Sequence, residues 1–158
     1  MVMRLPTAAT ITRPANTTAY ASGDVITSGT AAALVFGTDA PAGRVRSATL
    51  IDGACQATKL DADLFLFDAT LTPDADNAAF TPTDAEMATC IGVISFAGSG
   101  AKVGDATSGA DGNVLLQSGV VDLPFVSPGR ALYGVLVARN AYTPVSAETF
   151  VIRLGVET

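Results

Sequence analysis

Residues 149–156 read Thr-Phe-Val-Ile-Arg-Leu-Gly-Val, and this stretch decides the fold class. Large apolar residues occupy every second position from Phe150 to Val156, and the positions between them include Arg153 and Gly155. Successive side chains of a β-strand point to opposite faces of a sheet. The alternation therefore predicts a strand with one buried face and one face in water.

The rest of the chain consists of short apolar segments separated by Gly, Pro, Asp, Asn and Ser. Segments of this length and spacing predict an all-β protein, either a sandwich or a barrel of antiparallel strands. The predicted strands span residues 8–12, 18–26, 31–36, 44–51, 63–68, 90–97, 114–117, 120–126, 131–139 and 149–156. No linker divides them, so we expect a single domain over residues 1–158.

Two segments add detail to this all-β pattern. Thr83 and Glu86 have the spacing of a capping box, which predicts one short helix. Pro14 has no N–H to donate to a central ladder. We therefore expect residues 8–12 to form an edge strand or part of an extended N-terminal arm over residues 1–15.

Three predicted strands carry apolar side chains on both faces. In residues 63–68 (Asp-Leu-Phe-Leu-Phe-Asp) the leucines point one way and the phenylalanines the other, and residues 90–97 and 131–138 share this property. A parallel sheet would cover both faces with helices, which this sequence does not predict. The second face of these strands must then be covered either by other protein chains or by the protein's own loops. We expect other chains, and therefore an oligomer or a component of a larger assembly.

The composition excludes several function classes. Nine Lys and Arg stand against fifteen Asp and Glu, which gives a net charge of −6, and the bases are scattered. Nucleic acids and anionic membranes are bound by clustered bases, so we expect neither as a partner. The chain has no His, which removes His-based catalysis and His metal ligands. Cys55 and Cys90 stand alone and are expected to be free thiols.

Three charged or glycine-rich patterns invite a chemical interpretation. Acidic residues gather over residues 61–86. They could be solvated strand ends, ligands of a calcium site or a catalytic carboxylate pair. We expect strand ends, because Ala79 stands where a calcium loop needs Gly. Five glycines in residues 98–112 lack phosphate-loop spacing and predict a long loop or hairpin tip. Arg44 and Arg46 are expected on a solvated face or in an inter-subunit salt bridge. We predict no enzyme activity, catalytic residue, metal or cofactor.

The expected cellular location follows from hydropathy. Residues 1–12 lack the apolar core and cleavage site of a secretory leader. No apolar run approaches the roughly 18 residues that cross a bilayer. We therefore expect a protein made in the cytoplasm with no membrane partner.

Four stretches, in order along most of the chain, are Ile11–Ile26, Phe65–Asp68, Phe80–Asp84 and Leu132–Leu154. Together they resemble small structural proteins of tailed bacteriophages, some of which are head decoration (cement) proteins. The resemblance implies a β-sandwich or jelly-roll fold and symmetric oligomers, in particular homotrimers at three-fold positions of a capsid. It contains structural motifs and no catalytic signature.

From the resemblance we expect a bacteriophage virion structural protein, made in the host cytoplasm. Its most specific form is a decoration protein on the capsid surface that stabilises the head by bridging subunits of the major capsid protein. The N-terminal arm would add contacts as a strand is added to a sheet edge. Its assembly contacts would be Arg4, Leu5, Ile11 and Arg13. The alternatives are a neck- or tail-associated virion protein and a carbohydrate-binding β-sandwich module.

Overall fold

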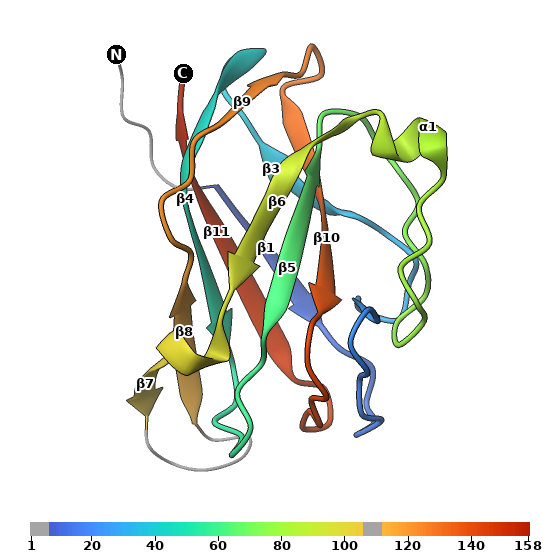
Figure 1. The fold of residues 1–158 in the computed structure, drawn as a ribbon, viewed down its shortest axis with the longest axis vertical. Coiled ribbons are helices and arrows are strands. Elements are labelled where there is room, and N and C mark those ends of the chain that lie inside the picture. Colours follow the sequence, from blue (N-terminus) through green and yellow to red (C-terminus); the bar gives the residue numbers. More distant parts are fainter. Residues whose placement is uncertain (1–6, 106–111) are drawn as a thin grey trace.

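The computed structural model describes residues 7–105 and 112–158 and consists of two antiparallel sheets packed face to face (Figure 1). The predicted all-β sandwich is confirmed. The described residues contain one α-helix, α1 (Asp84–Met87). Thr83 caps this helix and Glu86 completes the capping box, as the sequence predicts.

The first sheet contains six strands. Their order is β1, β11, β4, β8 and β7, and β9 pairs with a second stretch of β4. The strands are β1 (Thr7–Thr12), β4 (Ala42–Asp52), β7 (Lys102–Asp105), β8 (Asn113–Gln117), β9 (Leu123–Val126) and β11 (Thr149–Glu157). The longest strands, β4 and β11, therefore lie together in the middle of this sheet.

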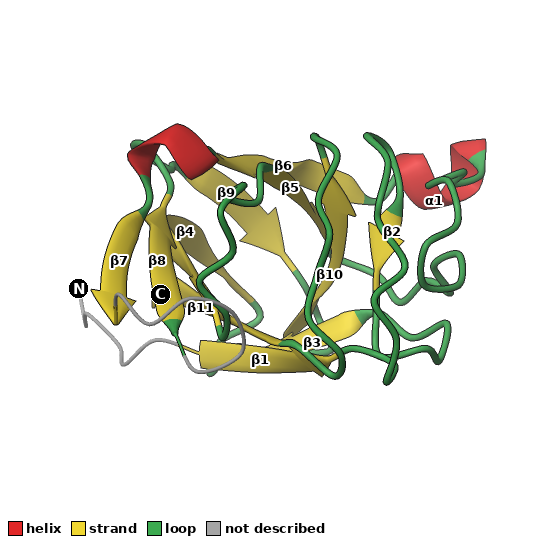
Figure 2. Ribbon diagram, turned by 90° about the horizontal axis from the view of Figure 1, so that it is seen from below, coloured by secondary structure: helices red, strands yellow, loops and turns green. Residues whose placement is uncertain are grey.

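The second sheet contains five strands. Their order is β2, β10, β5 and β6, and β3 pairs with another stretch of β10. The strands are β2 (Val25–Ile26), β3 (Leu34–Gly37), β5 (Ala62–Phe67), β6 (Cys90–Phe96) and β10 (Ala131–Ala138). The edge strands β1 and β3 of the two sheets lie side by side, where the sandwich closes (Figure 2).

The alternation in residues 149–156 has the predicted meaning. Phe150, Ile152 and Leu154 of β11 are fully buried between the sheets, whereas Arg153 is exposed on the outer face. Because β11 pairs with both β1 and β4, its inward residues lie in the middle of the main core. Apolar burial on this face supplies the driving force that holds the two sheets together.

The chain itself covers the outer face of the second sheet. After β5, residues 68–83 run along this face, and residues 77–80 pair with residues 23–25 through backbone hydrogen bonds. The apolar cluster formed here contains Val25, Phe67, Leu71, Val135 and Val137. Phe80 packs against it from the covering segment, with its ring centroid 4.9 Å from that of Phe65.

This cover changes the argument for a partner chain. Both faces of β5 and β10 are largely buried, as predicted, but the second face is buried by β2 and residues 68–83 of the same molecule. These two strands therefore give no support to the expectation of other chains, which remains a prediction. Residues 68–83 have no strand or long helix pattern, so their role as a cover depends on where the fold places them.

β6 is the third strand that carries apolar side chains on both faces, and only one of its faces is covered. Ile94 and Phe96 are buried, whereas Val93 is 43% exposed. β6 is the edge strand of its sheet and pairs only with β5, so residues 68–83 do not bury its outer side chains as they do those of β10. The prediction of two covered faces is wrong for this strand.

The start of the described chain is part of the sandwich. Residues 7–12, within the arm predicted over residues 1–15, form β1 and pair with β11 along their whole length, from Thr7 opposite Leu154 to Thr12 opposite Thr149. The edge-strand alternative therefore describes this segment. Its partner lies at the other end of the sequence, so local pattern could not distinguish a paired edge strand from a free arm.

The glycine-rich segment is more regular than a long loop. Residues 98–100 form a short 3-10 turn, and β7 then pairs with β8 as the first strand of a hairpin. The hairpin alternative thus fits the part of the segment that is described. The remaining tip, residues 106–111, lies outside the described residues.

Candidate functional site

The structure places two of the four predicted assembly contacts inside the protein. Arg4 and Leu5 lie outside the described residues. Ile11 is 3% exposed in the main core, and Arg13 is 2% exposed. In this arrangement, neither Ile11 nor Arg13 offers its side chain to another chain.

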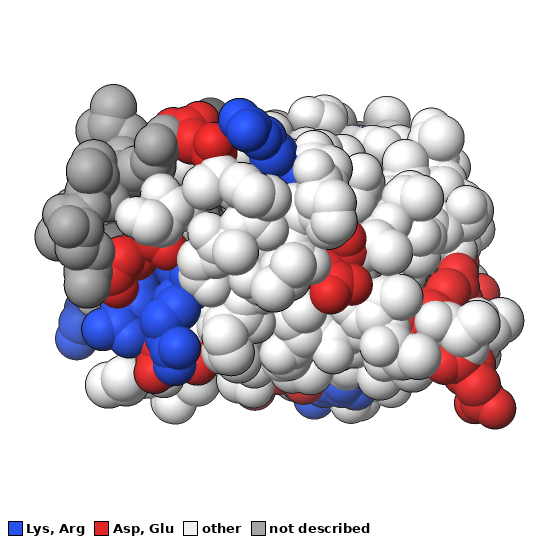
Figure 3. Space-filling model, turned by 90° about the horizontal axis from the view of Figure 1, so that it is seen from above, with Lys and Arg blue, Asp and Glu red and all other residues white. Residues whose placement is uncertain are grey.

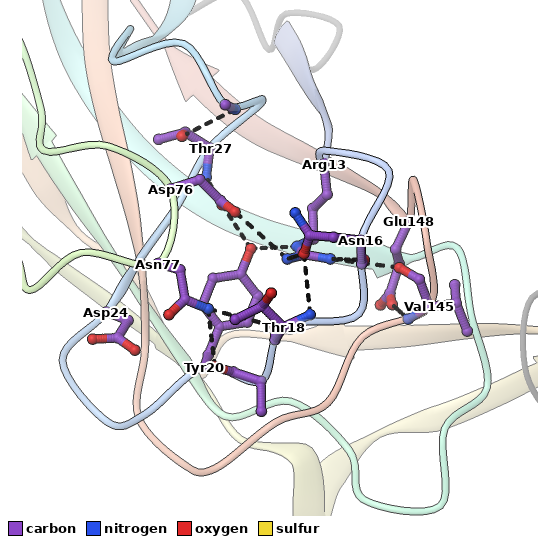
Figure 4. A network of polar contacts seen from close by, with 12 residues as sticks. Arg13, Asn16, Thr18, Tyr20, Asp24, Thr27, Asp76, Asn77, Val145 and Glu148 are labelled. Atoms are coloured by element: carbon purple, nitrogen blue, oxygen red, sulfur yellow. Dashed lines mark hydrogen bonds and ion pairs between the residues drawn. The ribbon is translucent and has the colours of Figure 1, made fainter.

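Arg13 instead organises a buried polar cluster, which we call the Arg13 cluster (Figure 4). Its guanidinium Nε donates to the hydroxyl of Tyr20 and also stacks over the Tyr20 ring, 4.7 Å from the centroid. A second guanidinium nitrogen lies 3.5 Å from a carboxylate oxygen of Asp76. The cation is therefore held by an aromatic ring, a hydroxyl and an opposite charge in one place.

Asp76 connects this cluster to the covering segment. Its Oδ1 accepts hydrogen bonds from the Tyr20 hydroxyl at 2.7 Å and from the Thr27 amide at 3.0 Å. Burial of the phenol raises the pKa of Tyr20, so the hydroxyl remains a donor over the ordinary pH range. The Arg13 cluster thereby fastens residues 68–83 to the segment that follows β1.

A second buried cluster consists of the acids Asp52 and Glu148 with the Tyr142 hydroxyl between them. We call this cluster of three residues the acid pair. All three residues are at most 3% exposed. The Tyr142 hydroxyl lies 2.9 Å from Asp52 Oδ2 and makes a second short hydrogen bond to Glu148 Oε1. Asp52 ends β4, whereas Tyr142 and Glu148 belong to the connection between β10 and β11.

Two like charges in this site oppose each other. Burial and the neighbouring Glu148 carboxyl raise the pKa of Asp52 to about 8. Burial, together with both acids, also raises the pKa of Tyr142 far above its ordinary value. The acid pair therefore favours the protonated form of Asp52 at neutral pH.

The two clusters are joined through the backbone. Tyr20 and Tyr142 exchange a pair of main-chain hydrogen bonds, and the Arg13 amide donates to the Glu148 carbonyl at 2.9 Å. Figure 4 shows Glu148 and Val145 beside the Arg13 cluster. Together the clusters hold three connections at one end of the sandwich: the segment after β1, residues 68–83 and the connection between β10 and β11.

None of these roles was predicted from the sequence. Tyr20 lies near the start of the predicted strand over residues 18–26, and Tyr142 lies between two predicted strands. Their acidic partners are at least 56 residues away except for Glu148. The available signal was weak: both are tyrosines in a chain that contains three. Buried tyrosines require a partner for their hydroxyl.

The acidic residues that the sequence analysis singled out have internal partners. Asp63 pairs with Arg139 at 2.6 Å, and Asp61 accepts the Gly98 amide at 2.6 Å. Asp74 accepts both the amide and the hydroxyl of Thr81. These contacts stabilise strand ends and turns, which is the first of the three alternatives for this group.

Arg44 and Arg46 form ion pairs within the chain. Asp122 accepts from both guanidiniums, at 2.6 Å in each case, and Arg46 also contacts Glu157. These two arginines hold the pKa of Asp122 well below its ordinary value. On the face shown in Figure 3, basic atoms lie directly against acidic ones. The two arginines are therefore balanced by acids within this surface cluster.

One surface hollow borders the free edge of β6, and we call it the β6 groove. It has a volume of about 220 Å³ and is lined by residues 93–95 and 118–123. Val93 and the fully exposed Val120 are its accessible apolar side chains, while Leu123 packs against the backbone at Gly92. Exposed apolar side chains beside an unpaired strand edge are suited to contact with another protein.

The remaining chemistry of the described residues is limited. Cys55 and Cys90 are free thiols, as predicted. Within residues 7–105 and 112–158, no three acidic or Cys side chains gather in a way that could hold a metal ion. No helix in the same ranges is long and apolar enough to cross a membrane.

Comparison with known proteins returned no relatives: the chain matches no protein-family model, no curated protein and no solved structure.

Proposed function

We propose that this chain is a structural protein of a tailed-bacteriophage virion, and specifically a head decoration protein that bridges subunits of the major capsid protein. The observation that carries the proposal is the order of the strands. Number β1, β3, β4, β5, β6, β8, β10 and β11 from one to eight. Strand one then pairs with eight, two with seven, three with six and four with five.

That pairing is what results when a long antiparallel ribbon is rolled up on itself, and it supports a jelly-roll assignment. Jelly rolls form the shells of many viruses, and they also occur in lectins. A fold alone does not fix a function, so this support is an analogy. The sequence resemblance to small virion proteins, carried by Ile11–Ile26 and Leu132–Leu154, favours the viral branch of the analogy.

The proposal no longer relies on uncovered faces of β5 and β10, because residues 68–83 bury them. It relies instead on surfaces that remain accessible. Val93 and Val120 in the β6 groove are the exposed apolar side chains most suited to a capsid contact. Homotrimer formation and the capsid three-fold axis remain parts of the proposal.

The test is co-sedimentation of the purified chain with expanded, empty heads. The heads come from a tailed phage that encodes this chain, and they are prepared without the chain on them. We expect saturable binding, and we expect Val120→Asp to weaken it without changing the urea midpoint. Thr10→Asp, an exposed change on the first sheet, is the matched control. A chain that never sediments with heads, at any ratio tested, contradicts the decoration role.

A carbohydrate-binding module is the second candidate. The observation in its favour is a hollow of about 360 Å³ on the second sheet, whose lining includes the polar residues Asp61, Asp63, Ser95 and Arg139. Carboxylates and hydroxyls can accept and donate hydrogen bonds to sugar hydroxyls. Binding on a glycan array that is lost in Arg139→Ala, together with no binding to heads, would favour this candidate.

A further inference from the structure

We propose that Asp52, Tyr142 and Glu148 form a buried proton lock, which fastens the β10–β11 connection to the end of β4 and weakens as the medium becomes alkaline. The inference is independent of the virion proposal. It concerns the stability of the isolated chain, so head binding and the lock can fail or succeed separately.

The row of oxygens in the acid pair needs more hydrogen atoms than the phenol supplies. Three oxygens stand in a row, Asp52 Oδ2, Tyr142 Oη and Glu148 Oε1, and both gaps are hydrogen bonds. The phenol supplies one hydrogen and can fill only one gap. The other gap needs a second hydrogen, and a carboxyl group is the only other source in the row.

The backbone contacts of the two acids determine where the second hydrogen lies. The outer oxygen of Asp52, Oδ1, accepts the Ala54 amide at 2.9 Å. The outer oxygen of Glu148, Oε2, accepts the Val145 amide at 2.7 Å. Both outer oxygens already face N–H groups, so the additional proton must lie on an inner oxygen and point at the Tyr142 hydroxyl. One acid is then neutral and the other is ionised.

Within the described residues, two cations belong to segments next to the acid pair. The Arg13 amide donates to the Glu148 carbonyl, and Lys59 follows Asp52 in the chain and contacts Cys55. The Arg13 guanidinium is bound to Tyr20, Asn16 and Asp76 and reaches the 140–148 connection only at the Val145 carbonyl. The Lys59 ammonium contacts Cys55 Sγ and the Gln56 carbonyl. Neither cation contacts a carboxyl group of the acid pair.

The direction of the pH effect follows from linkage. Burial and Glu148 raise the pKa of Asp52 to about 8, above its ordinary value of 3.8, so the folded chain holds a proton that the unfolded chain releases. The stabilisation is complete below about pH 4 and is lost as pH rises through about 8. In this window, each pH unit raises the unfolding equilibrium constant by up to about tenfold.

No histidine titration overlaps the pH range in which this loss of stability is expected. His is the side chain that ordinarily titrates between about pH 5 and pH 8, and the chain has none. The test is therefore urea unfolding at about pH 5, 6, 7 and 8, with Asp52→Asn and Glu148→Gln as variants. In either variant, an amide NH2 replaces the carboxyl hydrogen on the inner side, and its oxygen can still accept the outer N–H.

We expect the wild-type urea midpoint to fall from about pH 5 to about pH 8, and we expect at least one amide variant to keep a constant midpoint. Asp63→Asn, which alters a surface acid paired with Arg139, should retain the wild-type slope. In wild type, carbon NMR of the side-chain carboxyls should show one acid titrating well above the ordinary range. A flat wild-type midpoint, or wild-type slopes in both amide variants, would overturn the proposal.

Discussion

The Arg13 cluster and the acid pair solve the same structural problem in different ways. Each is centred on the hydroxyl of a buried tyrosine, and the two tyrosines are joined by main-chain hydrogen bonds. In the Arg13 cluster, the carboxylate of Asp76 faces a guanidinium, so opposite charges balance. In the acid pair, Asp52 faces Glu148 across Tyr142, so only a proton can remove the repulsion.

Burial alone therefore does not determine how a polar site responds to pH. A balanced ion pair keeps its charges over a wide pH range, because arginine does not lose its proton in proteins. A pair of acids changes its charge when one proton leaves. The same end of the sandwich therefore contains a fastening that is insensitive to mild alkali and one that is sensitive to it.

The largest expected effect comes from breaking the balanced cluster. Arg13→Ala leaves the Asp76 carboxylate buried without its cation, and it removes a donor from the Tyr20 hydroxyl. Loss of one partner of a buried pair costs about 3–5 kcal/mol. Urea unfolding at neutral pH measures this loss of stability.

Arg139→Ala is the matched control, because its pair with Asp63 lies at the surface. Exposed pairs contribute about 0–1 kcal/mol. If the two alanine variants lose equal stability, the Arg13 cluster is no more important than an ordinary surface ion pair.

Removal of the tyrosine hydroxyls should cause an intermediate loss of stability, and its pH dependence distinguishes the two clusters. Tyr20→Phe and Tyr142→Phe each remove a buried hydroxyl that makes two hydrogen bonds, and each should cost about 1–3 kcal/mol. The cost of Tyr142→Phe should be greater at about pH 9 than at about pH 5, because two ionised acids then lack the phenol between them.

The cost of Tyr20→Phe should be the same at both pH values, since the Tyr20 hydroxyl lies between a guanidinium and a single carboxylate and not between two acids. Chemical denaturation of both variants at the two pH values makes the comparison. Equal pH dependence in the two variants would remove the distinction between the clusters.

The smallest expected effect is a gain in stability. Ala147 lies in the connection that carries the acid pair and has a φ of 55°, a left-handed conformation that costs a residue with a Cβ about 1–2 kcal/mol. Ala147→Gly removes this strain but gives the unfolded chain more freedom, so a net gain of about 0.5 kcal/mol is expected.

Asn77 in the Arg13 region is the companion position, with a φ of 63°. Its side-chain amide donates to the Ala19 carbonyl at 2.9 Å, so Asn77→Gly loses a hydrogen bond as well as strain and should give no gain. Thermal unfolding of the two glycine variants tests the contrast. A loss of stability in Ala147→Gly would show that strain at this position is not significant.

Prediction from sequence succeeded where the pattern is local. Burial of every second residue in β11 and the capping box of Thr83 and Glu86 depend on neighbours within a few positions. It left alternatives open where the outcome depends on distant segments. Pro14 was compatible with an edge strand or an extended arm, and the pairing of β1 with β11 decides for the edge strand.

The candidate site shows the same division more strongly. Arg13 was predicted as an assembly contact because it lies in the expected N-terminal arm. Its burial depends on Tyr20, seven residues away, and on Asp76, sixty-three residues away. The acid pair could not be predicted at all, since Asp52 and Tyr142 are separated by 90 positions.

Side-chain alternation and capping act between near neighbours, so an antiparallel sandwich or barrel with a short capped helix is predictable from the residues alone. The cover of β5 and β10 by residues 68–83, and the burial of two acids in one site, arise from long-range packing. The physical reason is that burial and electrostatic coupling depend on distance in space. Chain topology brings these groups together regardless of their separation in sequence.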